Sequence, residues 1–279
     1  MKKLKAVFIL VGSISLILIV VIVAGWFDYT QKNQQSKTKT GITIDLKQDN
    51  SYPKISNFEV PILMYHYIRD ASGEDELGRN LSVDPKTFDA QMAWLKENDF
   101  ESVKLSDLAD MERTELSKVN GEGGKPVVIT FDDGYLDAYT EAFPVLKKYG
   151  FTGTFFIITN FIGKDNYMNS DQIAALRKAG MEIGSHTLTH PNLTDLESAD
   201  VRRQLTESKD DTNVFCYPAG RYNDRVKDLV KEAGYVAAVT TKSGVATEDT
   251  KLFDLPRLRI TNISAVAFGN VIEHALNND

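Results

Sequence analysis

Two adjacent carboxylates at the end of a short apolar run are the first residues that could carry out chemistry. Asp132 and Asp133 follow Pro126-Val-Val-Ile-Thr-Phe131, whose β-branched residues predict a buried strand, and Gly134 comes after them. Side chains alternate along a strand, but the chain turns where the strand ends, so both acids can reach one site from different directions. Two acids with two different roles are then possible. The same residues also suit an ordinary turn, and this stretch alone leaves both interpretations open.

A pair of histidines follows a second short strand pattern. Met181-Glu-Ile-Gly184 leads to His186 and His190, two of only four histidines in the chain. Four residues apart, they would lie on one face of a helical turn and could bind one metal ion, with Asp133 as a third ligand. Such a set leaves coordination positions for water and substrate. A surface helix can carry two histidines without a metal, but the scarcity of histidine here favours the metal site.

The two stretches together resemble the first two signature motifs of the polysaccharide deacetylases, carbohydrate esterase family 4. Thr130-Phe-Asp-Asp-Gly134 and His186-Thr-Leu-Thr-His190 carry the resemblance, which extends over residues 60–261. In that family the first Asp is the catalytic base, and the second Asp and the two His bind a divalent metal. The resemblance therefore implies the base Asp132 and the metal ligands Asp133, His186 and His190. Zn²⁺ is the metal expected for such a set, which does not exclude Co²⁺, Ni²⁺ or Fe²⁺.

Tyr217-Pro-Ala-Gly220 resembles a third motif of the family, a Pro-x-Gly turn. The backbone N–H after the proline helps to form an oxyanion hole there, which implies this role for Ala219. Standing alone, the motif would be a plain turn. Many members place an Arg just before this proline to orient the base, whereas this chain has Phe215-Cys-Tyr217. Arginines further on could replace it, or could be solvated or in structural ion pairs. The candidates for binding substrate or orienting the base are Tyr217, Arg257 and Arg259.

A narrower resemblance concerns the general acid. Pro61-Ile-Leu-Met-Tyr-His-Tyr67 is similar to the branch that contains the exported poly-N-acetylglucosamine deacetylases of biofilm systems, in which an N-terminal His replaces the acid of a C-terminal Leu-x-His motif. The resemblance assigns this role to His66, for which a structural hydrogen bond is the alternative. Ile272-Glu-His274 superficially matches the Leu-x-His motif. Ser264 can cap an amphipathic helix there, however, so we expect His274 to face solvent.

Strands and helices alternate after Val60, which predicts an α/β fold with a parallel sheet. The expected strands cover residues 60–65, 100–103, 126–131, 152–158, 181–184, 214–217, 235–240 and 258–260. The expected helices start at Asp84, Ser106, Asp137, Ser170, Ser198, Asn223 and Ser264. So many units in one domain predict a distorted (β/α) barrel of about seven parallel strands. The candidate site residues follow strands directly, as expected at the catalytic face of a barrel.

The first residues predict a membrane anchor and a tether. Met1-Lys-Lys-Leu-Lys5 precedes an almost unbroken apolar run from Ala6 to Phe27, which is long enough to cross a bilayer as a helix. We expect residues 1–27 to be an uncleaved transmembrane helix and residues 28–57 to be a flexible extracellular linker. Residues 58–279 would then form an extracellular catalytic domain. The alternative is a signal peptide cleaved near Ala24, which would give a secreted protein.

Composition limits the partners and the core. The formal net charge is −7 and the domain has no basic clusters, so nucleic acid is not an expected partner. The single cysteine, Cys216, cannot form an internal disulfide, and a buried free thiol in an apolar strand is the simplest interpretation. About 220 residues remain beyond anchor and linker, enough for one well-buried domain, which we expect to be monomeric.

The function implied by the resemblance is a metal-dependent N-deacetylase. Its substrate would be the GlcNAc units of an extracellular or cell-wall polysaccharide, either poly-N-acetylglucosamine or peptidoglycan. An O-acetyl esterase acting on a cell-surface glycan could use the same site. A glycoside hydrolase could use Asp132 with another carboxylate, but it would not need the histidine pair. A non-catalytic glycan-binding relative would keep the fold and lose ligands, whereas this chain has all three.

Overall fold

The computed structural model describes residues 59–110 and 124–277, which belong to one compact unit. The expected anchor, residues 1–27, and the expected linker, residues 28–57, lie outside the described residues. Residues 114–125, whose polar and glycine-containing sequence predicts a loop, lie mostly outside them as well. Within the described part of the chain, no helix is both long and apolar enough to span a bilayer.

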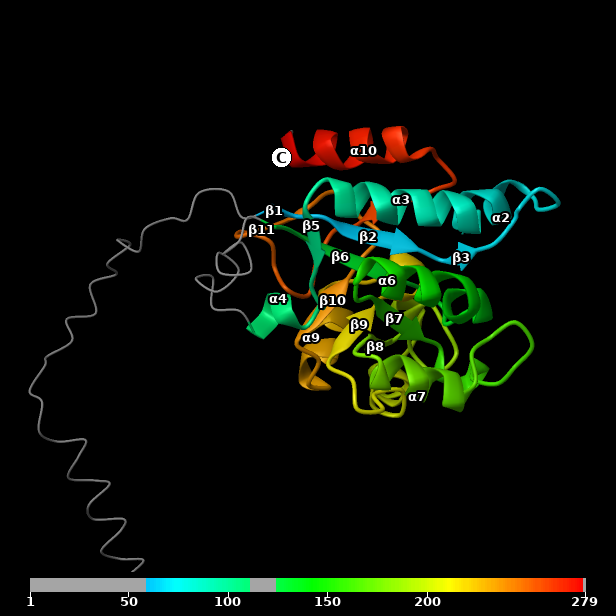
Figure 1. Ribbon diagram of the computed structural model, residues 1–279. Helices are drawn as coiled ribbons and strands as arrows, with labels where there is room; N and C mark the ends of the chain where they lie inside the picture. Colours follow the sequence, from blue (N-terminus) through cyan, green and yellow to red (C-terminus); the bar gives the residue numbers. More distant parts are fainter. Residues whose placement is uncertain (1–58, 111–123, 278–279) are drawn as a thin grey trace, which may run out of the picture. The chain divides into compact units, whose positions relative to one another are not determined.

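A parallel sheet forms the centre of this unit (Figure 1). Its strands follow the order β10-β9-β8-β7-β6-β2-β12, and β5 also pairs with β6. The bounds are β2 (Ile62–Tyr65), β5 (Phe100–Ser102), β6 (Lys125–Phe131), β7 (Thr154–Ile157), β8 (Glu182–Ser185), β9 (Val214–Cys216), β10 (Ala237–Val239) and β12 (Leu258–Arg259). Two small sheets join β1 (Glu59–Val60) to β11 (Ala246–Thr247), and β3 (Tyr67–Ile68) to β4 (Ser82–Val83).

The sheet is a half-barrel and not the fuller barrel that the sequence predicts. Its two edge strands, β10 and β12, are not paired with each other. The segment just before β12 lies against β10 instead, where Leu255 forms an isolated bridge with Val239 and its carbonyl accepts a hydrogen bond from the Thr240 N–H at 2.9 Å. The prediction of a parallel sheet is confirmed. The segment before β12 partly covers the open side of the half-barrel.

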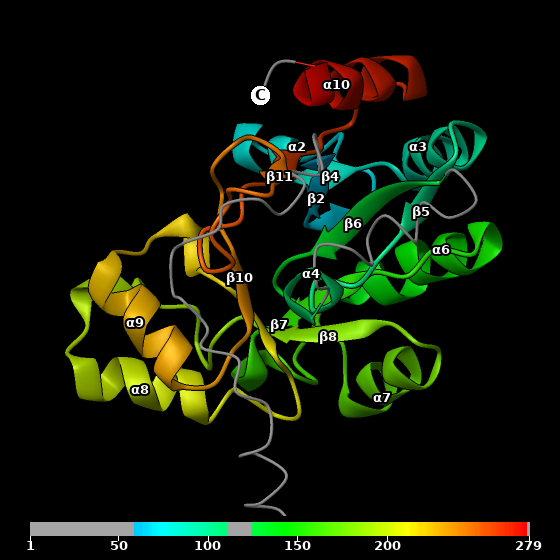
Figure 2. The same cartoon turned by 90° about the vertical axis from the view of Figure 1, so that its left-hand side faces the viewer.

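Helices cover the sheet from outside. Their bounds are α2 (Glu76–Leu81), α3 (Pro85–Glu97), α4 (Asp107–Asp110), α6 (Phe143–Tyr149), α7 (Ser170–Lys178), α8 (Ser198–Thr206), α9 (Asp224–Glu232) and α10 (Ala265–Asn277). Figure 2 shows α3, α6 and α7 on one side of the strands and α8 and α9 on the other. The last helix, α10, packs along α3, and Gly269 allows close approach because a Cβ there would lie 2.5 Å from the Trp94 ring.

Most helix starts follow their sequence signals. The Asp84 side chain caps α3, and the Asn223 side chain caps α9. The sequence also predicts Ser170 as the capping residue of α7, which is wrong by one residue, although α7 begins at Ser170. Asn169 is the cap, because its side chain accepts the Gln172 N–H while the Gln172 side chain accepts the Asn169 N–H, which forms a capping box.

The helix expected after the Asp pair changes its winding. It begins as a π-helical segment, η2 (Ala138–Ala142), and continues as α6. Pro144 lies in the first turn of α6, where its missing N–H interrupts the regular hydrogen-bond ladder. Gly150 ends the helix in the left-handed conformation, with a φ of 75°.

Both faces of the central strands are buried, which explains why they appear as continuous apolar runs. Leu63 and Ile129 belong to one apolar cluster, and their neighbours Ile62 and Val128 belong to another. Successive side chains alternate between the two clusters. The side chains of the candidate site lie instead where the strands end.

Candidate active site

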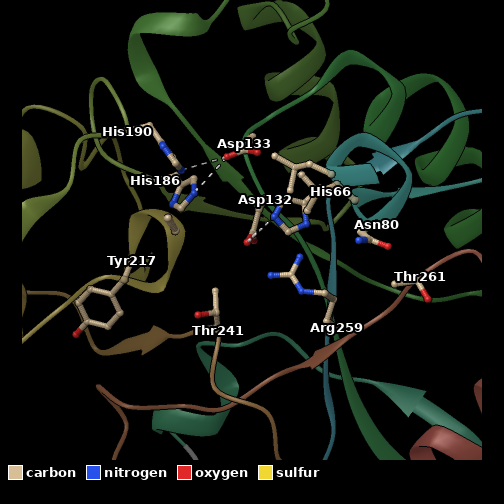
Figure 3. A pocket seen from close by; sticks show the side chains of 13 residues that line it. His66, Asn80, Asp132, Asp133, His186, His190, Tyr217, Thr241, Arg259 and Thr261 are labelled. Atoms are coloured by element: carbon tan, nitrogen blue, oxygen red, sulfur yellow. Dashed lines mark ion pairs between the residues drawn. The ribbon is translucent and has the colours of Figure 1, made fainter. Parts of the chain in front are cut away.

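A cavity of about 670 Å³ opens at the carboxyl ends of the parallel strands. Its lining draws residues from five strand ends: His66, Asp132, Asp133, His186, His190, Tyr217, Ala219 and Arg259. Figure 3 shows these side chains arranged around the Asp pair. The cavity thus brings together all the predicted site residues except Arg257, which lies buried behind Asp132.

Asp133 and the two histidines form a group that could hold a metal ion. The Asp133 Oδ1 atom lies 3.3 Å from His186 Nε2 and 3.6 Å from His190 Nε2. Ligands held about 2.0–2.1 Å from a tetrahedral ion are themselves about 3.3 Å apart, so the spacing fits a single ion. Two imidazoles and one carboxylate suit Zn²⁺ and related borderline metals.

The backbone after β8 is not the helical turn that the four-residue spacing predicts. Thr187 and His190 have positive φ angles of 70° and 58°. The His190 N–H donates to the Thr187 Oγ1 atom at 2.9 Å, which closes a tight turn. Residues with side chains rarely adopt positive φ, and such positions are common at functional sites. The histidines meet through this strained turn, with ring centroids 4.7 Å apart.

The orientation of His186 is fixed from the neighbouring strand. Its Nδ1 atom lies 2.8 Å from the Cys216 carbonyl oxygen, which can only accept a hydrogen bond. Nδ1 therefore carries the proton, and Nε2 is left to face Asp133 and a metal ion. Because His186 is buried, this contact holds the ring in place before any ligand arrives.

Asp132 is held by a buried arginine. Arg257 Nη1 lies 2.7 Å from Asp132 Oδ1, and Nη2 lies 2.8 Å from Oδ2. Burial alone would raise the pKa of Asp132, but the charge and hydrogen bonds of Arg257 bring it well below its usual value. Of the two arginines that the sequence offers as base-orienting residues, only Arg257 contacts Asp132 within the described residues. The Asp132 carboxylate is therefore ionised at neutral pH.

The two candidate general acids lie in different places. His66 follows β2, and its Nε2 atom is 3.7 Å from Asp132 Oδ2. Burial lowers the pKa of His66, and the attraction of the nearby carboxylates only partly opposes this. His274 is exposed on α10 and does not line the cavity. Of these two histidines, only His66 lies in the cavity beside Asp132.

The turn after β9 is the short 3₁₀ helix η5 (Pro218–Gly220). Ala219 lines the cavity with a positive φ of 50°. Gly220 is required beside it, since a Cβ there would lie 1.9 Å from Thr241 Oγ1. The Tyr217 hydroxyl donates to the Phe253 carbonyl at 3.1 Å and points away from the Asp pair (Figure 3), so it does not contact Asp132.

Several residues of the site were not predicted from the sequence. Cys216 is buried and free, as expected, but its sulfur also lies 3.3 Å from Arg257 Nη2 and 3.6 Å from Asp132 Oδ2. Other lining residues carry no recognisable sequence signal: Leu77, Asn80 and Leu81 on α2, and Thr241 and Thr261 in loops.

A parallel half-barrel with a positioned carboxylate and an Asp-His-His group at its strand ends defines a class of hydrolases with a possible metal site. The family model described as polysaccharide deacetylase matches residues 120–238. YxkH of Bacillus subtilis (strain 168) is 33% identical over 252 residues, which covers 86% of this chain and 86% of that protein. The chain belongs to the polysaccharide deacetylase family and is a deacetylase-type hydrolase.

Two further relatives extend the comparison. Poly-beta-1,6-N-acetyl-D-glucosamine N-deacetylase of Staphylococcus aureus (strain MRSA252) is 28% identical over 233 residues, covering 72% of this chain and 78% of that protein. The structure of the Streptococcus pyogenes deacetylase PplD in complex with acetate matches with a TM-score of 0.69 and 30% identity. It covers 78% of this chain and 98% of PplD.

Proposed function

We propose that this protein removes N-acetyl groups from the GlcNAc units of an extracellular or cell-wall glycan, with a divalent metal bound by Asp133, His186 and His190. The observation that carries the proposal is the pair of contacts at the strand end of β6. Asp133 Oδ1 lies 3.3 and 3.6 Å from the Nε2 atoms of the two histidines, which is the separation expected of ligands to one metal ion. Asp132 beside it is held by Arg257. One carboxylate is thus available for a metal and the other for a proton.

The chain's own residues would divide the hydrolysis of the acetamide between them. A bound divalent ion would polarise the acetyl carbonyl and acidify a water molecule. Asp132 accepts the proton of the attacking water, and Arg257 keeps both carboxylate oxygens in place. The same contact lowers the pKa of Asp132. Arg257 therefore fixes the position of the carboxylate but makes it a weaker base. The Ala219 N–H donates to the oxygen on which negative charge develops.

The proton must then reach the departing amine. His66 is neutral at rest because burial lowers its pKa. It can take the proton from Asp132, whose Oδ2 atom is 3.7 Å from His66 Nε2, and deliver it to the amine nitrogen. His66 is the only histidine that takes part in this proton transfer, because His186 and His190 are the proposed metal ligands. The proton that leaves the water is the one that the product amine receives.

The relatives support an N-acetylated glycan as the substrate. The staphylococcal relative acts on poly-beta-1,6-N-acetyl-D-glucosamine by its name, and PplD has been seen with acetate, the product expected here. An O-acetyl esterase would use the same groups and remains the second candidate. An ester needs no strong acid for its leaving group, so loss of His66 should harm amide hydrolysis more than ester hydrolysis.

The deciding experiment uses N-acetylglucosamine oligomers and the full-length protein with added divalent metal. Released acetate and new reducing ends are measured on the same samples. Acetate without reducing ends supports the deacetylase, reducing ends support a glycosidase, and neither product supports a binding protein. Chelation should abolish acetate release, and separate addition of Zn²⁺, Co²⁺, Ni²⁺ and Fe²⁺ should identify the metals that restore it. Purified peptidoglycan and poly-N-acetylglucosamine, assayed side by side, then compare the two polymers.

We also propose that residues 1–27 anchor the protein in the membrane with the catalytic domain outside the cell. The apolar run and the lysines before it support this arrangement. Protease added to intact cells should remove the domain and leave a membrane-bound N-terminal fragment. An N-terminus found near Ala24 in the culture medium would instead show cleavage and secretion.

A further inference from the structure

Arg259 is a positively charged residue of the cavity that has no counter-ion among the described residues. It lies in β12, is exposed, and lines the cavity. No hydrogen bond or ion pair joins its guanidinium to any of the residues that the structure describes. Arg257, two residues earlier, is fully buried and bonded to Asp132. The two arginines therefore have different roles, although only Leu258 lies between them in the sequence.

The inward direction of Arg259 follows from strand alternation. Leu258 and Ile260 belong to the apolar cluster beneath the outer helices, so the side chains between them face the other way. Arg259 pairs with Met64 of β2, two residues before His66. Figure 3 shows the Arg259 guanidinium pointing toward Asp132 and His66. The Arg259 guanidinium therefore faces the space that a substrate would occupy.

The acids of the cavity already have partners. Both oxygens of Asp132 accept from Arg257. Asp133 lies against His186 and His190, where the proposed metal would add further positive charge. The Arg259 charge is therefore left for a ligand, and a neutral sugar would leave it without a counter-charge. A planar guanidinium matches a carboxylate through two parallel hydrogen bonds.

The wall beside Arg259 suits a sugar ring. Asn80 and Thr261 provide an amide and a hydroxyl on the same side of the cavity (Figure 3). Leu77, which also lines the cavity, is 65% exposed and offers an apolar surface at its edge. We propose that Arg259 binds a carboxylate carried by the glycan beside the acetamido sugar, so that this site is suited to an acidic glycan. The inference rests on the proposed deacetylase function and names the class of its substrate.

The test compares two oligosaccharides of equal length in which GlcNAc alternates with N-acetylmuramic acid. One carries free lactyl carboxylates and the other carries their methyl esters. With the full-length, metal-loaded protein at low salt, we expect the free acid to have a KM about tenfold lower, which corresponds to about 1.4 kcal/mol. The kcat values should be similar. Rising salt should reduce the difference, because Arg259 is exposed to solvent.

Variants of Arg259 test whether this residue causes the preference for the free acid. Arg259→Gln should remove the difference in KM, and Arg259→Lys should keep part of it, because charge remains while the two-point geometry is lost. Arg203→Gln on α8 is a matched control outside the cavity and should behave as the wild type. Equal KM values in the wild type would overturn the inference. A preference retained in Arg259→Gln would do so too, as would an equal loss of kcat on both oligosaccharides.

A binding measurement separates this inference from the proposed function. Asp132→Asn should bind both oligosaccharides without removing their acetyl groups, and calorimetry can compare its affinities for them. If the wild type releases no acetate from either oligosaccharide but Asp132→Asn binds the free acid more tightly, the deacetylase proposal fails and the carboxylate site stands. If acetate is released from both and the affinities are equal, the deacetylase stands and the carboxylate site fails.

Discussion

Arg257 and Asp132 lie 125 residues apart in the sequence, and their side chains meet in two parallel hydrogen bonds of 2.7 and 2.8 Å. Both side chains are almost completely buried. Arg257 also donates to the Thr240 carbonyl and to Thr130 Oγ1, at 2.8 and 3.0 Å. Each buried charge in this pair therefore depends on the other for its stability.

Replacing Arg257 should damage both stability and turnover. Arg257→Gln leaves the Asp132 charge buried without its partner, and we expect the free energy of unfolding to fall by about 3 kcal/mol. The pKa of Asp132 should rise at the same time, because the group that lowers it is lost. Urea unfolding measures the first effect, and kcat measured against pH reports the second.

The double variant Arg257→Gln/Asp132→Asn provides the control. Removing the second charge should restore part of the stability, although not the activity. If the double variant were as unstable as the sum of the single ones, the ion pair would not be the cause. The loss would then come from packing around the arginine.

The two adjacent acids should respond differently to the same substitution. Asp133→Asn should reduce metal content and activity together, because Asp133 lies close enough to both histidines to share one metal ion with them. Asp132→Asn should keep the metal and lose turnover by about a hundredfold or more, as expected for a general base. Metal analysis of purified variants, beside acetate release, checks this. Equal metal loss in both variants would reverse the proposed division of roles.

His66 and His274 form a second matched pair. His66→Ala should keep metal binding and folding but lower kcat by about a hundredfold, because the cavity would lack its proton donor. His274→Ala should change little, because that side chain is exposed on α10. Acetate release and thermal unfolding of both variants measure the outcome. A large loss with His274→Ala and none with His66→Ala would assign the acid to the C-terminal helix.

Asp137 should make stability depend on pH. Burial raises its pKa to about 6, and its Oδ1 atom is buried with no hydrogen-bond partner among the described residues. A carboxyl whose folded pKa lies above its unfolded value stabilises the fold when protonated, and that stability is lost as pH rises through the folded pKa. Asp137→Asn stays neutral. Its unfolding free energy relative to the wild type should therefore rise by about 1 kcal/mol between pH 5 and pH 8.

Urea unfolding at the two pH values checks this prediction. Asp171→Asn, in the exposed first turn of α7, is a suitable control. It should show no comparable change between the two conditions. A difference that shrinks toward pH 8 would contradict the sign derived for Asp137.

Local signals in the sequence predict the strands of the parallel sheet and most helix starts. The buried run before Asp132 and the cap at Asp84 show this, since each depends on neighbouring residues alone. The grouping of Asp133 with His186 and His190 could also be predicted, because parallel strands bring their carboxyl ends to one edge. The turn between the histidines could not. It depends on the Thr187 hydroxyl in a positive-φ turn, which spacing alone does not reveal.

Contacts between distant strands mark the limit of such predictions. Arg257 and Arg259 are equal candidates in the sequence for contacting Asp132, and only the packing of Arg257 against Thr240, Thr130 and Asp132 separates them. The position of Cys216 next to Arg257 likewise depends on how β9 lies beside β8 and β10. These relationships arise from tertiary packing, and no short motif encodes them.

The strand order has a consequence for how the site is completed as the chain is made. The proposed metal ligands all lie within residues 133–190 and follow strands β6 and β8. Arg257, which holds Asp132, comes much later in the sequence, directly before β12, and β12 pairs with β2. A nascent chain can therefore assemble its metal ligands before its base is oriented. In the proposed mechanism, Asp132 would be oriented only after Arg257 and β12 have been synthesised and docked.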